Sequence, residues 1–248
     1  MYNPFTLRNK KILVTGASSG IGRAVAIECS RMGAELIITG RNEQRLNETF
    51  NKLKKGNHKK IIADLRFDEQ LENIASLINK LNGIVHCAGI TNPVPFQFVN
   101  RDKFEEIFSI NFLSPALLTN MLLKKKIIEN GASIIFISSV SGVYCSSVAG
   151  SLYSSTKGAI NGLIKGMALD LANKQIRVNS VCPAMIETNI FEDGRITKEQ
   201  LEEDKRKYPL KRYGKPEEVA YAVIYLLSDA SGWVTGSNLL IDGGYTLL

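Results

Sequence analysis

The apolar residues of the chain form short, nearly continuous runs separated by longer amphipathic stretches. Runs rich in Ile and Val, as in strands that a parallel sheet buries on both faces, lie at 11–15, 35–40, 60–64, 83–89, 133–139, 177–182 and 238–242. Helical periodicity fills the intervals near 21–32, 42–54, 68–80, 101–128, 152–173 and 216–228. This alternation predicts an α/β fold, a doubly wound Rossmann-type parallel sheet with helices on both faces.

The 248 residues suit one domain of this kind, because no linker, repeat or low-complexity segment interrupts the pattern. We therefore expect a single catalytic domain over 1–248. The one long irregular stretch, about 184–215, is rich in charge and broken by Pro209 and Gly214. Such a stretch inside a compact domain is typical of a substrate lid or binding loop, and a surface excursion without function is the alternative.

Composition narrows the class of protein further. Hydrophobic residues make up 44% and charged residues 22%, which are ordinary values for a globular protein. The four cysteines form no Cys-x-x-Cys pair and there are two histidines, so we expect free thiols and no metal site. No run approaches the ~20 apolar residues of a membrane span, and the N-terminal residues lack a signal-peptide pattern, which predicts a cytoplasmic protein.

The formal net charge of +7 has two interpretations. It can indicate nucleic-acid or membrane binding, or a solvated basic surface that suits anionic substrates and cofactors. Lysines gather at 52–60 and 124–126, at the ends of helical patterns, where they complement the helix macrodipole. Because no nucleic-acid motif is present, we expect neither nucleic acid nor membrane as a partner.

The first strand runs directly into a glycine-rich turn, TGASSGIG at 15–22, and a helix follows. At the first β-to-α turn of such a sheet, free N–H groups and the positive partial charge of the helix N-terminus hold a dinucleotide pyrophosphate. The glycines permit a tight turn, close approach of phosphate and close packing of helix on strand. The candidate cofactor contacts in this turn are Gly16, Ser18, Ser19, Gly20, Ile21 and Gly22.

The end of the second strand indicates which cofactor binds. An acidic residue there would bond the ribose 2′-OH of NAD and repel a 2′-phosphate. This chain has Gly40 followed by Arg41, whose guanidinium can hold a phosphate through paired donors. The sequence therefore favours NADP(H), and a merely solvated Arg41 at a helix start is the alternative.

Candidate chemistry lies at 153–157 (YSSTK), where a helical pattern begins. Positions i and i+4 share a helix face, so we expect the Lys157 ammonium to lie near the Tyr153 phenol and to lower its pKa. A tyrosine so placed can act as general acid in carbonyl reduction or as base in alcohol oxidation. A serine hydroxyl at the end of the fifth strand, from Ser138 or Ser139, can polarise a substrate carbonyl there.

These motifs, spread from Lys10 to the C-terminus, resemble the short-chain dehydrogenase/reductase family. The resemblance implies a seven-stranded sheet of order 3-2-1-4-5-6-7 and a catalytic set of Asn111, Ser139, Tyr153 and Lys157. Asn111 is implied to kink the helix near 101–128 and to hold, through its carbonyl, a water that relays protons to the lysine. A buried polar residue that caps or crosses between elements is the alternative interpretation of Asn111.

The resemblance also implies further cofactor contacts, at Asp64, Leu65, Ala88, Gly89, Tyr153, Lys157, Pro183, Ile186 and Thr188. Asp64 could equally be a helix cap. His86 and Cys87 depart from the family, which has two asparagines there, and Ala184 replaces a glycine, so a positive φ would be costly at that position.

The stretch 209–220 and the ending IDGG at 241–244 are similar in style to 3-oxoacyl-[acyl-carrier-protein] reductases. We therefore expect hydride transfer between NADP(H) and a carbonyl or secondary alcohol, with an acyl-carrier-linked substrate. The alternative substrate is a small ketone, sugar or secondary metabolite, since only Lys174 matches an expected carrier-binding arginine and Asn130 replaces the other. The intact catalytic set argues against a non-catalytic NADP-binding sensor.

The resemblance further implies a homotetramer that assembles through the helices near 101–128 and 152–173 and the C-terminal strand. The substrate pocket is expected to be lined by Ser139, Tyr144, Tyr153, Met185 and Ile190.

Overall fold

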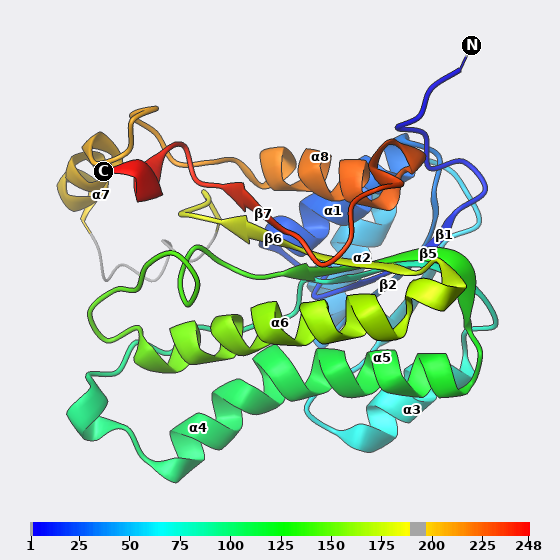
Figure 1. Cartoon of the computed structure of the whole chain (residues 1–248), viewed down its shortest axis with the longest axis horizontal. Helices are drawn as coiled ribbons and strands as arrows, with labels where there is room; N and C mark the ends of the chain where they lie inside the picture. Colours follow the sequence, from blue (N-terminus) through cyan, green and yellow to red (C-terminus); the bar gives the residue numbers. More distant parts are fainter. Residues whose placement is uncertain (1, 189–196) are drawn as a thin grey trace.

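A computed structural model describes residues 2–188 and 197–248. In these residues one parallel sheet, which lies between two layers of helices in Figure 1, has the strand order β3-β2-β1-β4-β5-β6-β7 that the family resemblance implied. The strands are β1 (Lys11–Thr15), β2 (Glu35–Gly40), β3 (Lys59–Ile62), β4 (Leu81–His86), β5 (Ile128–Ile137), β6 (Arg177–Pro183) and β7 (Asn238–Ile241). Since all strands are parallel, the residues that follow them gather at one edge of the sheet, its carboxyl edge.

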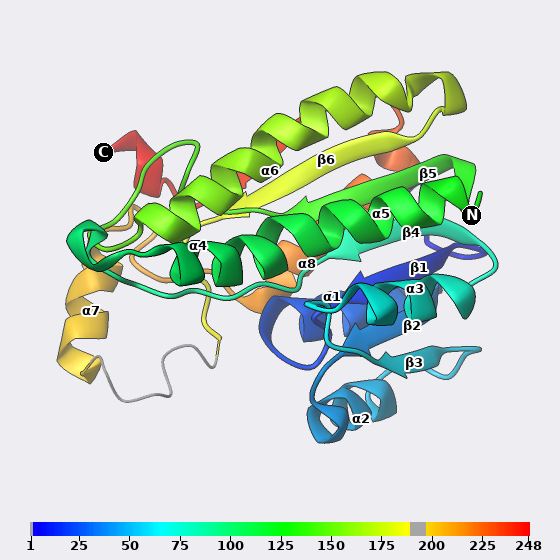
Figure 2. The same ribbon diagram turned by 90° about the horizontal axis from the view of Figure 1, so that it is seen from below.

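Helices cover both faces of the sheet, and each face has its own apolar core (Figure 2). The helices are α1 (Gly20–Arg31), α2 (Glu43–Asn51), α3 (Asp68–Ser76), α4 (Arg101–Phe108), α5 (Ser114–Lys124), α6 (Ser151–Asp170), α7 (Lys198–Arg206) and α8 (Pro216–Leu227). One core joins the sheet to α3, α5 and α6, and the other joins it to α1, α2 and α8. Strand residues such as Leu13 and Ile12 alternate between these two cores, which explains the continuous apolar runs.

The helix expected near 101–128 is one continuous helical stretch with a change of geometry in the middle. Between α4 and α5, residues Ser109–Leu113 form a π-helical turn that contains Asn111. By length and composition, Arg101–Lys124 could cross a membrane. However, Ile107, Leu118 and Leu122 along it are buried, as in a core helix of a sheet-based domain.

Two features differ from the sequence expectation. Strand β5 begins at Ile128 and not at 133, and its register against β4 shifts between Leu81 and Gly83, so Asn130 lies inside an irregular part of the strand. The stretch 184–215, expected to be irregular, contains α7. Its N-terminus is a capping box in which the Thr197 hydroxyl accepts from the Gln200 backbone and the Gln200 side chain accepts from the Thr197 backbone.

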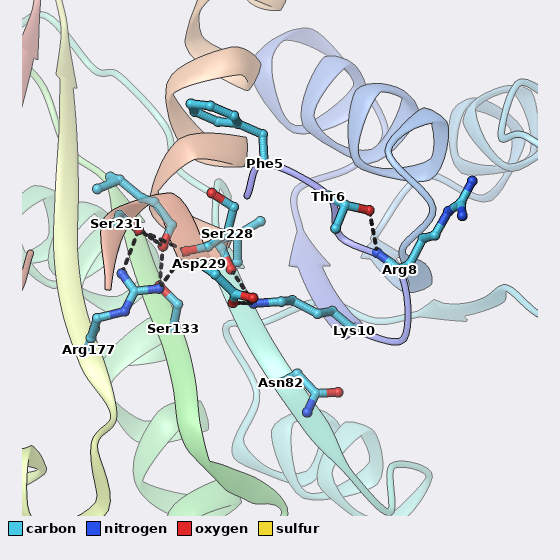
Figure 3. A network of polar contacts seen from close by, with 12 residues as sticks. Phe5, Thr6, Arg8, Lys10, Asn82, Ser133, Arg177, Ser228, Asp229 and Ser231 are labelled. Atoms are coloured by element: carbon cyan, nitrogen blue, oxygen red, sulfur yellow. Dashed lines mark hydrogen bonds and ion pairs between the residues drawn. The ribbon is translucent and has the colours of Figure 1, made fainter. Parts of the chain in front are cut away.

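The amino edge of the sheet is closed by polar contacts around the C-terminal end of α8 (Figure 3). Lys10 donates to the Leu227 carbonyl at 3.1 Å and pairs with Asp229 at 2.6 Å. Arg177 at the start of β6 donates to the Ser228 carbonyl and to the Ser231 hydroxyl. Two cations therefore lie at the C-terminal end of α8, where the helix macrodipole is negative, and Lys10 satisfies the carbonyl of its last residue.

Candidate active site

The glycine-rich turn between β1 and α1 is shaped for close backbone approach. Gly16 has a φ of +65°, and a Cβ on it would lie 2.7 Å from the Ala88 nitrogen, so no other residue fits there without a shift. A Cβ on Gly22 would lie 2.3 Å from the Gly16 carbonyl oxygen, which presses the first turn of α1 onto the loop. The side chain of the N-cap residue Ser19 accepts no hydrogen bond from the start of α1. The N–H groups of the first helical turn are therefore available to a ligand. These features fit a bound pyrophosphate.

The ends of β2 and β3 carry a cationic patch beside this turn. Arg41 is exposed and, among the described residues, has no hydrogen-bond or ion-pair partner, so its guanidinium is available to a phosphate. Gly40 lies against Ser18, with 3.2 Å between a Cβ built on it and the Ser18 hydroxyl oxygen. An acidic side chain is thus absent from the place where it would repel a 2′-phosphate.

Asp64 is not the cap of the following helix, because the N-cap of α3 is Phe67. Its carboxylate pairs with Arg66 through the guanidinium and accepts from the Arg66 backbone N–H at 3.1 Å. This pairing lowers the pKa of Asp64, with a smaller contribution from Arg41. Leu65, its neighbour, is buried. The pairing of Asp64 with Arg66 was not anticipated from the sequence.

The end of β4 lies directly beside the glycine turn. The Thr15 hydroxyl accepts from the Cys87 and Ala88 backbone N–H groups at 3.2 and 3.3 Å, which ties the ends of β1 and β4 together. A Cβ on Gly89 would lie 3.2 Å from Asn111 Oδ1 and 3.8 Å from Lys157 Nζ, so this glycine joins the cofactor turn to the candidate catalytic residues.

The two departures from the family at β4 do not supply acid–base chemistry. His86 is buried, stacks on Phe136 and bonds the Thr119 hydroxyl through Nε2 at 2.8 Å. Burial lowers the His86 pKa to about 3 and raises the Cys87 pKa to about 12, so both side chains are neutral near pH 7.

Ser139, Tyr153 and Lys157 meet where β5 ends and α6 begins. The Ser139 side chain lies close enough to the Tyr153 phenol to lower its pKa. The Lys157 ammonium donates to the Ile137 carbonyl at 2.7 Å and lies 5.5 Å from the centre of the Tyr153 ring. Ser138, the alternative to Ser139, is turned inward and buried, with its hydroxyl 3.4 Å from the Lys157 carbonyl. The geometry therefore favours Ser139 as the serine that faces the tyrosine.

The expected lowering of the Tyr153 pKa is not what this environment produces. Burial raises the Tyr153 pKa to about 12 and outweighs the effect of the Ser139 side chain, which acts in the opposite direction. Burial also lowers the Lys157 pKa to about 8. The spacing correctly placed the lysine beside the phenol, but Lys157 is buried and Tyr153 is half-buried, which disfavours the charged form of each.

Asn111 in the π-helical turn crosses to the loop after β4. Its Oδ1 accepts from the Ile90 N–H at 2.8 Å, and its Nδ2 donates to the Ile90 carbonyl at 3.0 Å and the Thr156 hydroxyl at 3.2 Å. The side chain is thus a buried polar group that crosses between elements, the alternative interpretation of Asn111. The backbone carbonyl of Asn111 lies in a turn whose hydrogen bonding departs from α-helical geometry.

The segment after β6 faces the glycine turn from the other side. A Cβ on Gly20 would lie 3.3 Å from the Thr188 methyl group, while Ile186 is buried in the core and Pro183 ends β6. Ala184 is not among the described residues with a positive φ, so its replacement of glycine causes no strain. Met185 lines a pocket with Tyr208 and Asp242. Ile190, expected in the substrate pocket, lies outside the described residues.

The basic residues considered for carrier docking lie at the opposite edge of the sheet. Tyr153 is at the start of α6, whereas Lys174 follows its end, and a helix of 20 residues spans roughly 30 Å. Lys124 ends α5 at the same amino edge, with Lys125 and Lys126 directly after it (Figure 1). These lysines are therefore remote from the candidate catalytic residues of the same chain.

This constellation defines a class of protein, the oxidoreductases that hold a nicotinamide dinucleotide on a Rossmann-type sheet. A family model described as Enoyl-(Acyl carrier protein) reductase matches residues 16–246. With this match and the relatives below, the chain belongs to the short-chain dehydrogenase/reductase family and is an oxidoreductase of that family.

Similar proteins cover nearly the whole chain. A 3-oxoacyl-[acyl-carrier-protein] reductase of Rickettsia conorii is 32% identical over 242 residues, covering 98% of this chain and 99% of the relative. A glucose 1-dehydrogenase of Gluconobacter oxydans is 33% identical, covering 96% and 92%. A solved structure from Beutenbergia cavernae, a candidate NAD(P)-dependent gluconate 5-dehydrogenase with NADP bound at low occupancy, has a TM-score of 0.90 at 27% identity and covers 99% and 100%.

Proposed function

We propose that this chain is an NADP(H)-dependent reductase of carbonyl compounds, with 3-oxoacyl groups linked to an acyl carrier as its substrate class. The observation that carries the reaction type is the contact of Ser139 with Tyr153 beside Lys157, at the edge where the glycine turn lies. The relative from Rickettsia conorii supports the substrate class.

The residues present fit the cofactor. The glycine turn at 16–22 would hold its pyrophosphate, and Arg41 its 2′-phosphate. Asp64 and Leu65 would lie at the adenine, Ala88 and Gly89 along the dinucleotide, and Pro183, Ile186 and Thr188 on the nicotinamide side. When bound, NADPH supplies the hydride that this chain's own side chains cannot supply.

The side chains of this chain position the carbonyl and move the proton. The hydroxyls of Ser139 and Tyr153 hold the carbonyl oxygen, and Tyr153 donates its proton to that oxygen as negative charge develops. A phenol whose pKa is about 12 keeps its proton at neutral pH, as a general acid must. The Lys157 ammonium stabilises the phenolate that remains. Lys157 and the Asn111 carbonyl form the relay through which a proton returns to Tyr153.

The reaction and its cofactor are tested together by measuring NADPH and NADH consumption over a panel of 3-oxoacyl thioesters, ketones and sugars. We expect NADPH to be used in preference to NADH. Arg41→Asp should weaken NADPH binding in a fluorescence titration by on the order of 1.5–3 kcal/mol and favour NADH in relative terms. Equal use of both cofactors by the wild type would contradict the assignment of Arg41.

A second candidate is oxidation or reduction of a small sugar or ketone. It is favoured by the glucose 1-dehydrogenase relative and by the distance of Lys174 and Lys124 from Tyr153. In the panel, a polar substrate turned over faster than every 3-oxoacyl thioester would establish this candidate in place of the first.

The same family likeness supports three further proposals about the setting of the reaction. We place the enzyme in the cytoplasm, and we assign residues 1–248 to one catalytic domain in which 184–215 covers the substrate.

We also expect a homotetramer. On the two helices implied in assembly, Leu113 and Leu169 are 47% and 80% exposed, a large fraction for apolar side chains, whereas Leu118 and Leu122 belong to the core.

A further inference from the structure

A cluster of buried polar side chains lies directly behind the candidate catalytic residues, and none of its members belongs to the proposed mechanism. We call it the Asn161 cluster: Asn161 on α6, Ser138 after β5, and Ser180 and Cys182 on β6. Each is at most 5% exposed. Polar groups this deeply buried must be hydrogen-bonded to be tolerated.

The amide of Asn161 is fully used within this cluster. Its Nδ2 donates to the Ser138 hydroxyl at 3.1 Å and to the Lys157 carbonyl at 2.9 Å. Its Oδ1 accepts from the Ser180 hydroxyl at 3.0 Å, and the Cys182 sulfur lies 3.9 Å from the same oxygen. One side chain therefore joins a helix to two strands.

Both contacts that the Asn161 Nδ2 donates end at, or next to, a candidate catalytic residue. Lys157 precedes Asn161 by one helical turn on the same face of α6. Ser138 lies between Ile137, whose carbonyl accepts from the Lys157 ammonium, and Ser139, which faces Tyr153. The Ser139 backbone N–H lowers the pKa of the Cys182 thiol, which is a sign that the two groups are close. The cluster thus connects α6 to the end of β5 at the level where the lysine, serine and tyrosine must meet.

Stability alone does not require an amide at this position. Replacing a buried hydrogen-bonded set by apolar groups of similar shape is often nearly neutral. A fully satisfied polar network instead specifies one geometry, and a misplacement of 1 Å at a reacting site can lower the rate ~10²-fold.

We infer that Asn161 is a positioning residue whose amide fixes the depth of α6 against the end of β5, so that Tyr153 and Lys157 meet Ser139. The kinetic part of this inference rests on the proposed function, whereas the structural part does not.

Asn161→Leu tests the inference, because it removes the amide and keeps the approximate size. The variant leaves acceptors for both neighbouring hydroxyls, since Ser180 lies 2.8 Å from Asn238 Oδ1 and Ser138 lies 3.4 Å from the Lys157 carbonyl. The matched control is Asn179→Leu. Asn179 is fully buried one residue before Ser180, but its amide bonds only the backbone of Val234 and Ser237.

The first measurement needs no turnover. Crystal structures of the wild type and both variants are compared for the contact of Lys157 with the Ile137 carbonyl and of Tyr153 with Ser139. We expect both contacts to change in Asn161→Leu and to persist in Asn179→Leu. Their persistence in Asn161→Leu would overturn the inference. If the wild type consumes no NADPH with any carbonyl, the proposed function fails, and this comparison still decides the role of Asn161.

The second measurement follows the chemical step. Asn161→Leu should lower kcat by ~10- to 100-fold, with KM and the NADPH dissociation constant within about threefold of wild type, and should raise the isotope effect measured with NADPH deuterated at C4. Asn179→Leu should lower the melting temperature without raising the isotope effect. An equal fall in kcat for both variants with no rise in isotope effect would mean that Asn161 is merely structural.

A third variant covers the case in which Asn161→Leu does not fold. The combination S138A/N161L/S180A removes the amide and both of its hydroxyl partners, so that few polar groups are left unpaired. We expect it to fold and to retain the low kcat and the raised isotope effect. Recovery of wild-type kcat in this combination would also overturn the inference.

Discussion

At the carboxyl edge of the sheet, burial moves Tyr153, Cys87 and Lys157 toward their neutral forms. It raises the pKa of Tyr153 and Cys87 to about 12 and lowers that of Lys157 to about 8. The tyrosine therefore holds a proton that it can donate, while the lysine is close to giving up its own. A group that must gain or lose a proton at neutral pH is most effective when its pKa lies near that pH, which suits Lys157 to the resupply of protons.

Replacing Tyr153 by Phe keeps the ring and removes the proton donor. We expect turnover to fall by at least ~10²-fold, which is typical for the loss of a general acid, while NADPH still binds in a fluorescence titration. Stopped-flow measurement of NADPH consumption checks the rate. Near-normal turnover in this variant would remove Tyr153 from the mechanism.

The buried Lys157 makes stability depend on pH in a definite direction. Below about pH 8 the folded and unfolded chains both carry its proton, so the folded state bears the full cost of a buried charge. Between this pH and the ordinary value of 10.5 only the unfolded chain binds the proton, so the cost declines as pH rises. Lys157→Met should therefore have a stability advantage over wild type near pH 7 that shrinks by on the order of 3 kcal/mol toward pH 10.5.

Thermal and denaturant unfolding of both proteins from pH 7 to 10 measures this difference. The titration of groups remote from Lys157 is common to the two proteins and cancels in the comparison, whereas Cys87 and Cys182 interact with Lys157 and are replaced by Ala in both proteins. A difference that stays constant over this range would show that the pKa of Lys157 is not lowered in the folded chain.

Sequence reasoning located single residues well and their protonation poorly. Arg41, Ser139 and Tyr153 could be placed because each follows or lies beside the end of a strand, and parallel strands end at one edge. The pKa of Tyr153 could not be predicted, since the i, i+4 spacing reports that Lys157 is near but not how much water both groups lose. Asn161 was also missed, because Ser138, Ser180 and Cys182 come from other elements and nothing in the local sequence of Asn161 reveals that they surround it.

At the scale of elements, the sequence predicts the interiors of helices and strands better than it predicts where they begin and end. The apolar interiors of β1, β2 and β7 made these strands predictable almost to the residue. The start of β5 was not, because its register shift leaves Asn130 and Gly131 exposed and without an apolar pattern. Helix α7 was overlooked although its capping box, Thr197 with Gln200, is visible in the sequence, since its strongly charged residues offer no apolar stripe.

The contacts of Arg177 at the C-terminal end of α8 allow the stability contributed by one helix end to be measured. Arg177→Met should destabilise the fold by roughly 1–3 kcal/mol, because the Ser228 carbonyl and the Ser231 hydroxyl lose a charged donor. The loss is limited because burial of the guanidinium, which lowers the Arg177 pKa, is itself costly. Denaturant unfolding measures the change. Arg101→Met is the control, since its ion pair with Glu105 is exposed and should contribute less than ~1 kcal/mol.

At the scale of the whole molecule, the sheet separates the candidate catalytic residues from the lysines considered for carrier docking. The cofactor turn and Tyr153 lie at the carboxyl edge, whereas Lys124 and Lys174 lie at the amino edge. Long-range attraction of an acidic partner acts over the whole surface and is screened within a Debye length of ~10 Å at 0.1 M salt. The net charge of +7 can therefore assist encounter with an acidic carrier even where no lysine touches the site.

We expect kcat/KM for a carrier-linked 3-oxoacyl substrate to fall as salt rises, and kcat/KM for a neutral ketone to stay nearly constant. A small thioester analogue of the same acyl chain is the control for effects of salt on the chemistry. Charge reversal at Lys124 to Lys126 should reduce the salt dependence if the amino edge steers the carrier. A flat profile with no preference for the carrier-linked form would favour the small-carbonyl candidate.

The contact of Lys10 with Leu227 and Asp229 spans almost the entire chain. A ribosome releases residue 10 long before it releases residue 229, so the N-terminal segment has no α8 end to bind while the nascent chain grows. The strand order has the same effect, because β7 is added last and only to β6. The amino edge of the newly made protein therefore stays open at least until residue 229 has left the ribosomal exit tunnel.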